Sequence, residues 1–252
     1  MAETSKRGTA EAPPTVVVND LKVTYRTYAS GRQVSKRMKV GRAGLRGIRE
    51  VNALKGVSFV VREGDSVGII GHNGSGKSTL LRTIAGLYPA TAGTVYASSR
   101  PSLLGVNAAL LQDLSGERNV ILGLLALGFT KAEAEERCAD VLEFAGMTEF
   151  KDLPMRTYSA GMSARLRFSI AVAREVQILL IDEALAVGDK AFLARSEQRI
   201  RELRKRAGSV FLVSHSMQSI LDTCNRVIWL HQGQIRMDGD PKTVVDAYEA
   251  SQ

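Results

Sequence analysis

Apolar residues are arranged along this chain in short uninterrupted runs and in helically spaced stretches. Residues 66–70, 178–183 and 209–215 each hold a short apolar run, which is typical of a strand buried on both faces of a parallel sheet. From Lys77 to Pro89, apolar residues recur at the spacing of one helix face. This alternation of strand and helix predicts an α/β fold built on a mainly parallel sheet.

The remaining pattern predicts additions to that core. Residues 15–18 or 21–25 are expected to form an early strand of an antiparallel β element. Residues from about 103 to 175 are expected to form a helical insertion, with one helix over 131–144 that ends near Gly146. Asp240 as N-cap and Pro241 at the first helical position predict a closing helix.

Length and composition limit what the chain can be. Its 252 residues and 44% hydrophobic content are enough for a large core. We expect one domain over residues 15–252, preceded by a disordered polar tail over residues 1–14. No apolar run approaches the roughly 18 residues that span a bilayer, and no signal peptide is recognisable. A soluble, intracellular chain is therefore expected, in which Cys138 and Cys224 are reduced, buried and inert.

A glycine-rich stretch follows the first apolar run and matches a phosphate-binding pattern. Gly71, Gly76, Lys77 and Ser78 satisfy G-x-x-x-x-G-K-[ST] between a predicted strand and a predicted helix. The glycines allow backbone conformations and a close approach that side chains would prevent. The N–H groups of the helix N-terminus favour a phosphate. A glycine-rich turn without a ligand is the alternative, which the flanking strand and helix disfavour.

This stretch therefore predicts a site for a nucleotide and Mg²⁺. Lys77 is expected to reach the β- and γ-phosphates, and the Ser78 hydroxyl is expected to ligate Mg²⁺. No guanine-reading Asn-Lys-x-Asp motif occurs, which disfavours a GTPase. The residues expected to bind the nucleotide are Gly71, His72, Asn73, Gly74, Ser75, Gly76, Lys77, Ser78 and Thr79.

Two carboxylates end the apolar run at residues 178–183. Asp182 and Glu183 point to opposite sides of a strand, so we expect them to have different roles. Asp182 is placed to hold Mg²⁺, directly or through water, and Glu183 to orient or deprotonate the attacking water. An isolated pair of this kind would more often cap a helix, but the phosphate loop upstream favours the catalytic interpretation.

Two further features point to a nucleotide. The run at residues 209–215 ends in His215, which we expect to make a catalytic contact, although a lone histidine is more often structural. A second glycine-bearing turn, formed by Ser159, Ala160, Gly161 and Met162, precedes a helical stretch and is a second possible anion site. One nucleotide does not need two such sites in one chain, so a second copy of the chain would explain the second anion site.

In this order and spacing, the motifs resemble those of the nucleotide-binding subunits of ATP-binding-cassette (ABC) transporters. The resemblance runs from about Val16 to Tyr248 and requires four motifs to agree. It implies a P-loop ABC ATPase fold that binds ATP and Mg²⁺. It also implies a homodimer, in which Ser159, Gly161 and Met162 of one copy cap the ATP held by the other.

The resemblance also assigns roles to single residues. It implies that Glu183 is the catalytic base and that His215 senses the γ-phosphate. It implies that an early aromatic residue, Tyr25 or Tyr28, stacks on adenine. An aromatic residue at such a position is as often part of the core.

One departure from the family pattern concerns coupling to the membrane. Most transporter cassettes carry a glutamine that links the metal site to the membrane subunit, whereas this chain has Val106 and Asn107 there, and Gln112 follows later. That role is left unassigned. The helical insertion is the expected docking surface for a membrane partner.

Several segments resemble cassettes that export lipid-linked polysaccharides, such as a galactan, an O-antigen or a teichoic acid. They are YSAGM, ALKGVSF, DLSGERNV and DEALAVGD, together with a basic insertion. The resemblance implies an integral membrane permease that handles the polysaccharide, a peripheral location on the cytoplasmic face of the inner membrane, and no nucleic-acid partner. A non-transport ABC-type ATPase acting on nucleic acid or ribosomes is the alternative, but the long coiled coils or second cassette usual in such chains do not occur here.

Positive charge is concentrated in the basic insertion, residues 26–50. It holds eight Lys/Arg and one Glu, so it carries +7 of the chain's net charge of +8. A solvated, flexible insertion is the simplest interpretation. Contact with a membrane surface or a partner protein, and binding to nucleic acid, are the alternatives.

Replacing five charges of the basic insertion separates these interpretations. If the insertion serves the membrane side, each charge near an anionic leaflet contributes about 1 kcal/mol. A variant in which glutamine replaces the five residues should hydrolyse ATP normally as an isolated chain, because none lies in the nucleotide motifs. In liposome flotation, subunit co-purification and export assays it should fail. The five residues are Arg32, Lys36, Arg37, Lys39 and Arg42.

Two other outcomes would contradict the membrane interpretation. If liposome binding, co-purification and export all survive, the insertion is a solvated loop. If the wild-type chain retains RNA or DNA in a salt-sensitive manner that the variant loses, the insertion binds nucleic acid.

Overall fold

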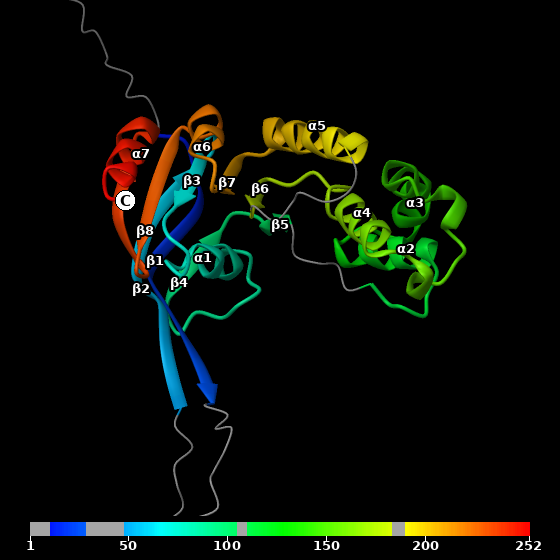
Figure 1. The fold of residues 1–252 in the computed structure, drawn as a ribbon, viewed down its shortest axis with the longest axis horizontal. Coiled ribbons are helices and arrows are strands. Elements are labelled where there is room, and N and C mark those ends of the chain that lie inside the picture. The colour runs from blue at the N-terminus through cyan, green and yellow to red at the C-terminus, as the bar shows by residue number, and fades with distance from the viewer. Residues whose placement is uncertain (1–10, 29–47, 105–109, 183–189) are drawn as a thin grey trace, which may run out of the picture.

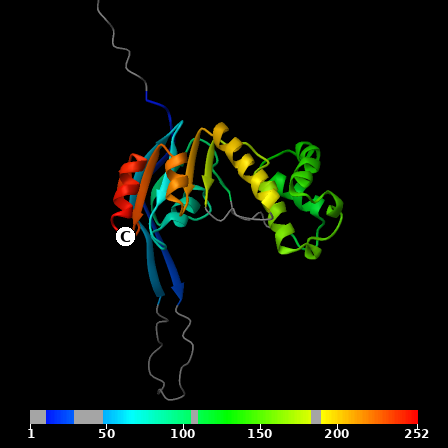
Figure 2. The same cartoon turned by 45° about the horizontal axis from the view of Figure 1, so that its top comes forward.

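The chain folds into a body with two β-sheets and a helical lobe on one side of it. The computed structural model describes residues 11–28, 48–104, 110–182 and 190–252. The lobe lies on the right of the body in Figure 1 and stays on that side in the rotated view of Figure 2. This mixed architecture confirms the predicted fold class.

In the described part of the chain, six strands form the larger sheet, in the order β5, β6, β7, β3, β8, β9. All neighbours pair in parallel except β8 and β9, which form an antiparallel hairpin. The bounds are Ser66–Ile70 (β3), Ser102–Leu104 (β5), Ile178–Ile181 (β6), Ser209–Val213 (β7), Arg226–His231 (β8) and Gln234–Gly239 (β9). The three apolar runs of the sequence are thus its three central strands β3, β6 and β7.

Alternate residues of the central strands enter two different cores. Val67 and Ile69 of β3 join a core shared with the smaller sheet and α1 (Lys77–Ile84). Ile70 joins a second core on the other face, which is covered by α5 (Lys190–Arg206), α6 (Met217–Thr223) and α7 (Pro241–Glu249). Burial on both faces explains why these strands are apolar at successive positions.

The smaller sheet is antiparallel, with the order β2, β1, β4. Its strands are β1 (Pro14–Tyr28), β2 (Ile48–Arg62) and β4 (Ala92–Ala97). Both stretches proposed for the early strand belong to β1, which continues through a register shift beside Asp20, a residue with a positive φ of 44°. Beyond the last pairing with β4, at Lys22, β1 and β2 extend away from the body as a two-stranded ribbon (Figure 1).

Part of the basic insertion forms the end of this ribbon. Arg26 and Glu50 lie on opposite strands and form an ion pair of 3.0 Å. Residues 29–47 lie outside the described residues. Residues 1–10 of the expected tail also lie outside them, whereas the carbonyls of Ala12 and Pro13 accept hydrogen bonds from Arg62 and from the amide of Glu63.

The helical lobe contains α2 (Gly116–Ala126), α3 (Lys131–Ala145) and α4 (Ala160–Ala171), with 3₁₀ turns at Thr148–Phe150 and Met155–Thr157. Thr130 and Glu133 form a capping box at the start of α3, and Gly146 ends it with a φ of 67°. This confirms the helix predicted over residues 131–144. The closing helix α7 also begins as predicted, with Asp240 as N-cap and Pro241 as its first residue.

The lobe has a core of its own. Its fully buried residues include Val120, Leu124, Leu142, Leu166 and Ile170. Three aromatic rings join the lobe to α5, since the centroids of Phe144, Phe168 and Phe192 lie 5.7–6.4 Å apart. No helix among the described residues is both long enough and apolar enough to cross a bilayer.

The two cysteines are buried and free, as the sequence predicts. Cys138 lies in the core of the lobe, and Cys224 lies in the core under α6. Burial raises the pKa of each thiol to about 11. Both thiols therefore stay protonated at neutral pH, which makes them poor nucleophiles.

Gly123 of α2 should tolerate a methyl group less well than Gly161 of α4. A Cβ at Gly123 would lie 2.7 Å from Cγ2 of the buried Ile170, whereas at Gly161 the nearest atom is 3.9 Å away. Gly123→Ala should lower the free energy of unfolding by about 1–3 kcal/mol, because overpacking outweighs the gain in helix propensity. Gly161→Ala should raise it slightly. Urea denaturation followed by circular dichroism measures both, and equal effects would contradict the close packing of α2 on α4.

Candidate functional site

The candidate site lies at the carboxyl edge of the three central strands. β3, β7 and β6 are neighbours and run in parallel, so the residues that follow them meet at one edge. Gly71 follows β3, Asp182 follows β6, and His215 follows β7 after Ser214. The topology therefore brings together three groups that are widely separated in the sequence.

The glycine-rich loop between β3 and α1 depends on residues without side chains. Gly71 has a φ of 142°, and a Cβ there would lie 2.1 Å from the carbonyl oxygen of Leu230. Gly76 has a φ of 109°, and a Cβ there would lie 2.7 Å from the carbonyl oxygen of Ala53. No other residue fits these positions without displacing the neighbouring backbone.

The N-terminus of α1 differs from the other helix starts whose caps the structure describes. Side chains cap α2, α3, α4, α6 and α7, but Gly76 provides no side-chain cap for α1, and the first turn holds no acidic residue. The first N–H groups of α1 therefore have no competing acceptor from a capping side chain. Such a helix start favours a bound anion.

Lys77 and Ser75 fit the same interpretation. The Nζ of the buried Lys77 donates to the carbonyl oxygens of Gly71 (2.6 Å) and His72 (3.1 Å), so the cation lies inside the loop. The buried Ser75 hydroxyl has no hydrogen-bond partner among the described residues. A phosphate oxygen would accept from both groups, so the loop fits a phosphate chain.

Backbone hydrogen bonds link the loop to the β8–β9 turn and, through this turn, to the smaller sheet. The Gly233 amide donates to the Ser75 carbonyl (3.0 Å), and the Lys55 amide donates to the Gly233 carbonyl (2.9 Å). Tyr25 of β1 reaches the first turn of α1, where its hydroxyl hydrogen-bonds the Thr79 hydroxyl at 3.1 Å. Its ring lies 4.7 Å from the ring of Tyr88. Tyr25 thus lies beside the loop, and its role toward adenine stays a prediction.

Asp182 is half-buried directly after β6, and Glu183 lies outside the described residues. Ser78 is in the first turn of α1. No group of three or more His, Cys, Asp or Glu side chains that could hold a metal ion occurs in the described ranges. The residues present fit Mg²⁺, which takes one or two protein oxygens and completes its shell with phosphate oxygens and water.

His215 is exposed and lines a cavity of about 410 Å³ beside the loop. Gly71, Ser214 and Tyr248 line the same cavity. His215 therefore faces space next to the first residue of the phosphate loop. This is the position in which a side chain could contact the terminal phosphate of a bound nucleotide.

The second glycine-bearing turn starts α4 in the helical lobe. Ser159 is the N-cap, and its hydroxyl accepts from the Met162 amide at 3.1 Å. Ser159, Ala160 and Gly161 are exposed, and the preceding Tyr158 is anchored by donating to the Phe150 carbonyl at 2.6 Å. In Figures 1 and 2 α4 is well separated from α1, so this turn does not join the phosphate loop of the same chain.

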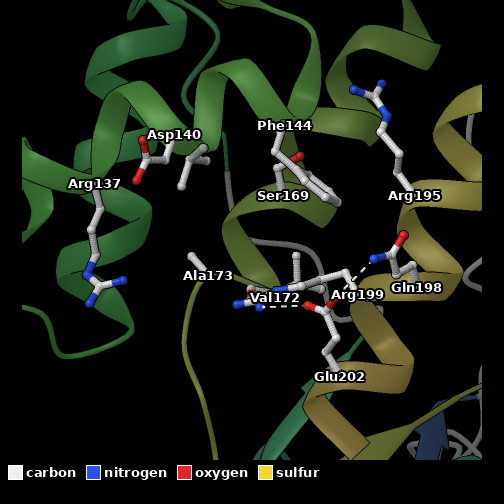
Figure 3. Close-up of a pocket in the computed structure, with 11 residues that line it drawn as sticks. Arg137, Asp140, Phe144, Ser169, Val172, Ala173, Arg195, Gln198, Arg199 and Glu202 are labelled. Atoms are coloured by element: carbon white, nitrogen blue, oxygen red, sulfur yellow. Dashed lines mark hydrogen bonds and ion pairs between the residues drawn. The ribbon is translucent and has the colours of Figure 1, made fainter.

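A cleft of about 400 Å³ lies between α3, α4 and α5 (Figure 3), and none of the residues that line it belongs to the phosphate loop. Arg199 of α5 donates to the carbonyl of Val172, the C-cap of α4, at 3.0 Å, and pairs with Glu202 at 3.4 Å. The Arg195 guanidinium lies 5.8 Å from the centre of the Phe192 ring. The cleft thus marks the joint between α5 and the lobe.

Two contacts near the site were not predicted from the sequence. Tyr88 packs against Tyr25, and Tyr248 packs against His72 of the phosphate loop at 5.5 Å between ring centroids. The only signal was that these residues are aromatic and lie near predicted helices. Their positions depend on the order of strands in the sheets, which the sequence pattern does not give.

Together, the parallel sheet, the glycine loop and the uncapped helix define a P-loop nucleotide-binding domain. The chain belongs to the ABC transporter family, because the family model described as ABC transporter matches residues 54–186. This confirms the family resemblance of the motifs.

Curated relatives narrow the type of family member. The chain is 40% identical to the O-antigen export system ATP-binding protein RfbB of Klebsiella pneumoniae, over 80% of this chain and 82% of the relative. It is 41% identical to the teichoic acids export ATP-binding protein TagH of Lactococcus lactis, over 78% of this chain. The match spans only 42% of that relative's length. The chain is therefore similar to ATP-binding subunits of polymer export systems.

Solved structures support the fold. The structure of a dimeric, post-hydrolysis state of the ATP-binding cassette MJ0796 bound to ADP and Pi aligns with 90% of this chain, with a TM-score of 0.65 and 22% sequence identity. A structure described as the ATP-binding subunit of an ABC transporter covers 93%, with a TM-score of 0.68 and 22% identity. The predicted P-loop ABC ATPase fold is thereby confirmed.

Lys77→Ala should weaken nucleotide binding, because it removes the cation that lies inside the loop. Charge-assisted bonds to phosphate are about twice as strong as neutral ones, so we expect ATP affinity to fall by about 10-fold or more. Isothermal titration of ATP into the chain measures this. Lys205→Ala, which removes an exposed charge of α5, is the control. Unchanged affinity in Lys77→Ala would contradict the assignment of the loop.

Proposed function

We propose that the chain is the ATP-binding and ATP-hydrolysing subunit of an ABC transporter that exports a lipid-linked polysaccharide across the cytoplasmic membrane. The observation that carries this proposal is the phosphate loop, in which the uncapped N-terminus of α1 and the buried Lys77 share one edge of the sheet with Asp182 and His215. ATP with Mg²⁺ is the ligand that this arrangement fits.

Each residue of the proposed site has a separate task. The loop amides and Lys77 bind the phosphates, and the Ser78 hydroxyl and the Asp182 carboxylate would hold Mg²⁺. When bound there, Mg²⁺ would supply positive charge that stabilises the phosphates during hydrolysis. Glu183, the next residue after Asp182, accepts a proton from the attacking water. His215 donates a hydrogen bond to the γ-phosphate from the far side of the cavity.

A homodimer completes the nucleotide site in this proposal. The turn formed by the exposed Ser159, Ala160 and Gly161 and the half-buried Met162 lies far from the phosphate loop of its own chain. A second copy in antiparallel orientation would bring it over the ATP bound by the first. The dimeric state named for the similar cassette MJ0796 supports this arrangement.

A lipid-linked polysaccharide is the proposed cargo, and a membrane permease handles it. The names of the similar proteins, which export O-antigen and teichoic acids, support this class of cargo. Within it we propose a galactan of the type that mycobacteria export for arabinogalactan synthesis, because the YSAGM and DEALAVGD segments resemble the cassette of that exporter.

The helical lobe is the proposed docking surface for the permease on the cytoplasmic face of the membrane. Large apolar side chains are exposed on it at Leu122 and Leu125 of α2 and at Phe150 and Leu153. A contiguous patch of exposed apolar side chains marks an interaction site, and we propose that these four side chains contribute to one. Co-purification of a membrane protein supports transport, whereas co-purification of RNA or DNA would favour the non-transport alternative.

Glu183→Gln should keep ATP binding and slow hydrolysis by on the order of 10² to 10⁴. The amide cannot accept the proton of the attacking water, whereas the phosphate contacts stay intact. The variant should accumulate as an ATP-bound dimer, measured by size-exclusion chromatography with ATP and by phosphate release. Glu202→Gln on α5, away from the loop, is the matched control. Normal turnover in Glu183→Gln would remove this residue from the role of base.

A further inference from the structure

We infer that Tyr248, in the last turn of α7, is a positioning residue for the phosphate loop and couples this helix to nucleotide binding. This inference rests on the proposed function. The centroid of its ring lies 5.5 Å from that of His72 and 5.4 Å from that of Trp229. His72 is the second residue of the loop, and Trp229 pairs in β8 with Ile70, the residue before the loop. Tyr248 therefore contacts the phosphate loop through His72 and the neighbouring strand β8 through Trp229.

Burial makes Tyr248 the fixed member of this group. Tyr248 is 8% exposed and belongs to the core under α7, whereas His72 is exposed. The start of α7 is held by Asp240, whose carboxylate accepts from the Thr243 amide at 3.1 Å. A buried ring on an anchored helix supports an exposed ring on a loop, so a displacement of His72 changes its contact with Tyr248.

The last turn of α7 also forms a wall of the nucleotide site. Tyr248 and Glu249 line the cavity of about 410 Å³ that contains Gly71 and His215. The helix thus reaches the side of the site at which the terminal phosphate is expected. A change in the loop on nucleotide binding has a direct path of contacts to α7.

Nucleotide binding should move His72. In the structure, Nζ of Lys77 donates to the His72 carbonyl at 3.1 Å. When a phosphate takes this cation, the carbonyl loses a donor, and we expect the backbone at His72 to shift as the carbonyl finds another partner. The adjustment passes to Tyr248 through the ring contact and on to Trp229, whose ring also lies 4.4 Å from the Arg236 guanidinium.

Trp229 is the chain's single tryptophan, so its fluorescence reports on this path. In the full chain, titration with ATP and Mg²⁺ should change the emission of Trp229 in step with binding measured by calorimetry. Tyr248→Leu should lose most of the emission change and bind ATP about two- to tenfold more weakly, the range expected for one aromatic pair. Tyr248→Phe keeps the ring and should retain the emission change.

Two further variants keep the test interpretable. His72→Ala changes an exposed side chain, so it should fold, and it should lose the emission change even if Tyr248→Leu does not fold. Tyr96→Leu, at a tyrosine that is 64% exposed on β4, should respond as the wild type does. Loss of the response in Tyr248→Leu and His72→Ala, but not in Tyr248→Phe and Tyr96→Leu, would support the inference.

Other outcomes overturn it. If the wild-type chain binds ATP without any change in Trp229 emission, or if Tyr248→Leu or His72→Ala keeps the full response, Tyr248 does not couple α7 to the loop, although the proposed function stands. If calorimetry shows no ATP binding to the wild-type chain, the proposed function fails and this inference fails with it.

Discussion

The close approach of the phosphate loop to β8 depends on a single glycine. The space where Gly71 would carry a Cβ is filled by the carbonyl oxygen of Leu230, 2.1 Å away. This contact sets the distance between the loop and β8. The Gly233 amide then fixes the middle of the loop by donating to the Ser75 carbonyl, and the Lys55 amide ties the same turn to β2. Both sheets thus converge on one short segment of backbone.

The electrostatics of the site follow from this convergence. With the backbone fixed, the start of α1 offers N–H groups that no side chain caps, and Lys77 donates to the carbonyls of Gly71 and His72. An unpaired buried ammonium would be costly, so these carbonyl contacts stabilise the lysine inside the loop. The fold itself thus holds the amides and the cation in place, which lowers the entropic cost of binding an anion.

The sequence predicted those features that are local in the chain. The phosphate loop, the start of α7 and the capping of α3 each depend on residues a few positions apart, so spacing alone identifies them. The division of β1 into two alternative strands could not be resolved, because Asp20 interrupts the alternation with a positive φ while the strand continues on both sides. The family resemblance predicted the fold as a whole.

The remaining features depend on long-range topology. The contact of Tyr248 with His72 joins residues far apart in the sequence, and that of Tyr25 with Tyr88 joins the first strand to the segment after α1. No periodicity encodes such pairs, because they are set by which strands become neighbours. The task proposed for the exposed turn at Ser159 involves a second chain, and for Glu183 the prediction still rests on the motif alone.

The separate core of the helical lobe has a consequence for how this chain loses its structure. The lobe buries residues such as Leu124 and Leu166 against one another, and it meets the helices of the larger sheet through the three rings at Phe144, Phe168 and Phe192. Cores that are packed separately can open as separate cooperative units. Amide hydrogens in the lobe and in the central strands should therefore exchange with solvent with different protection.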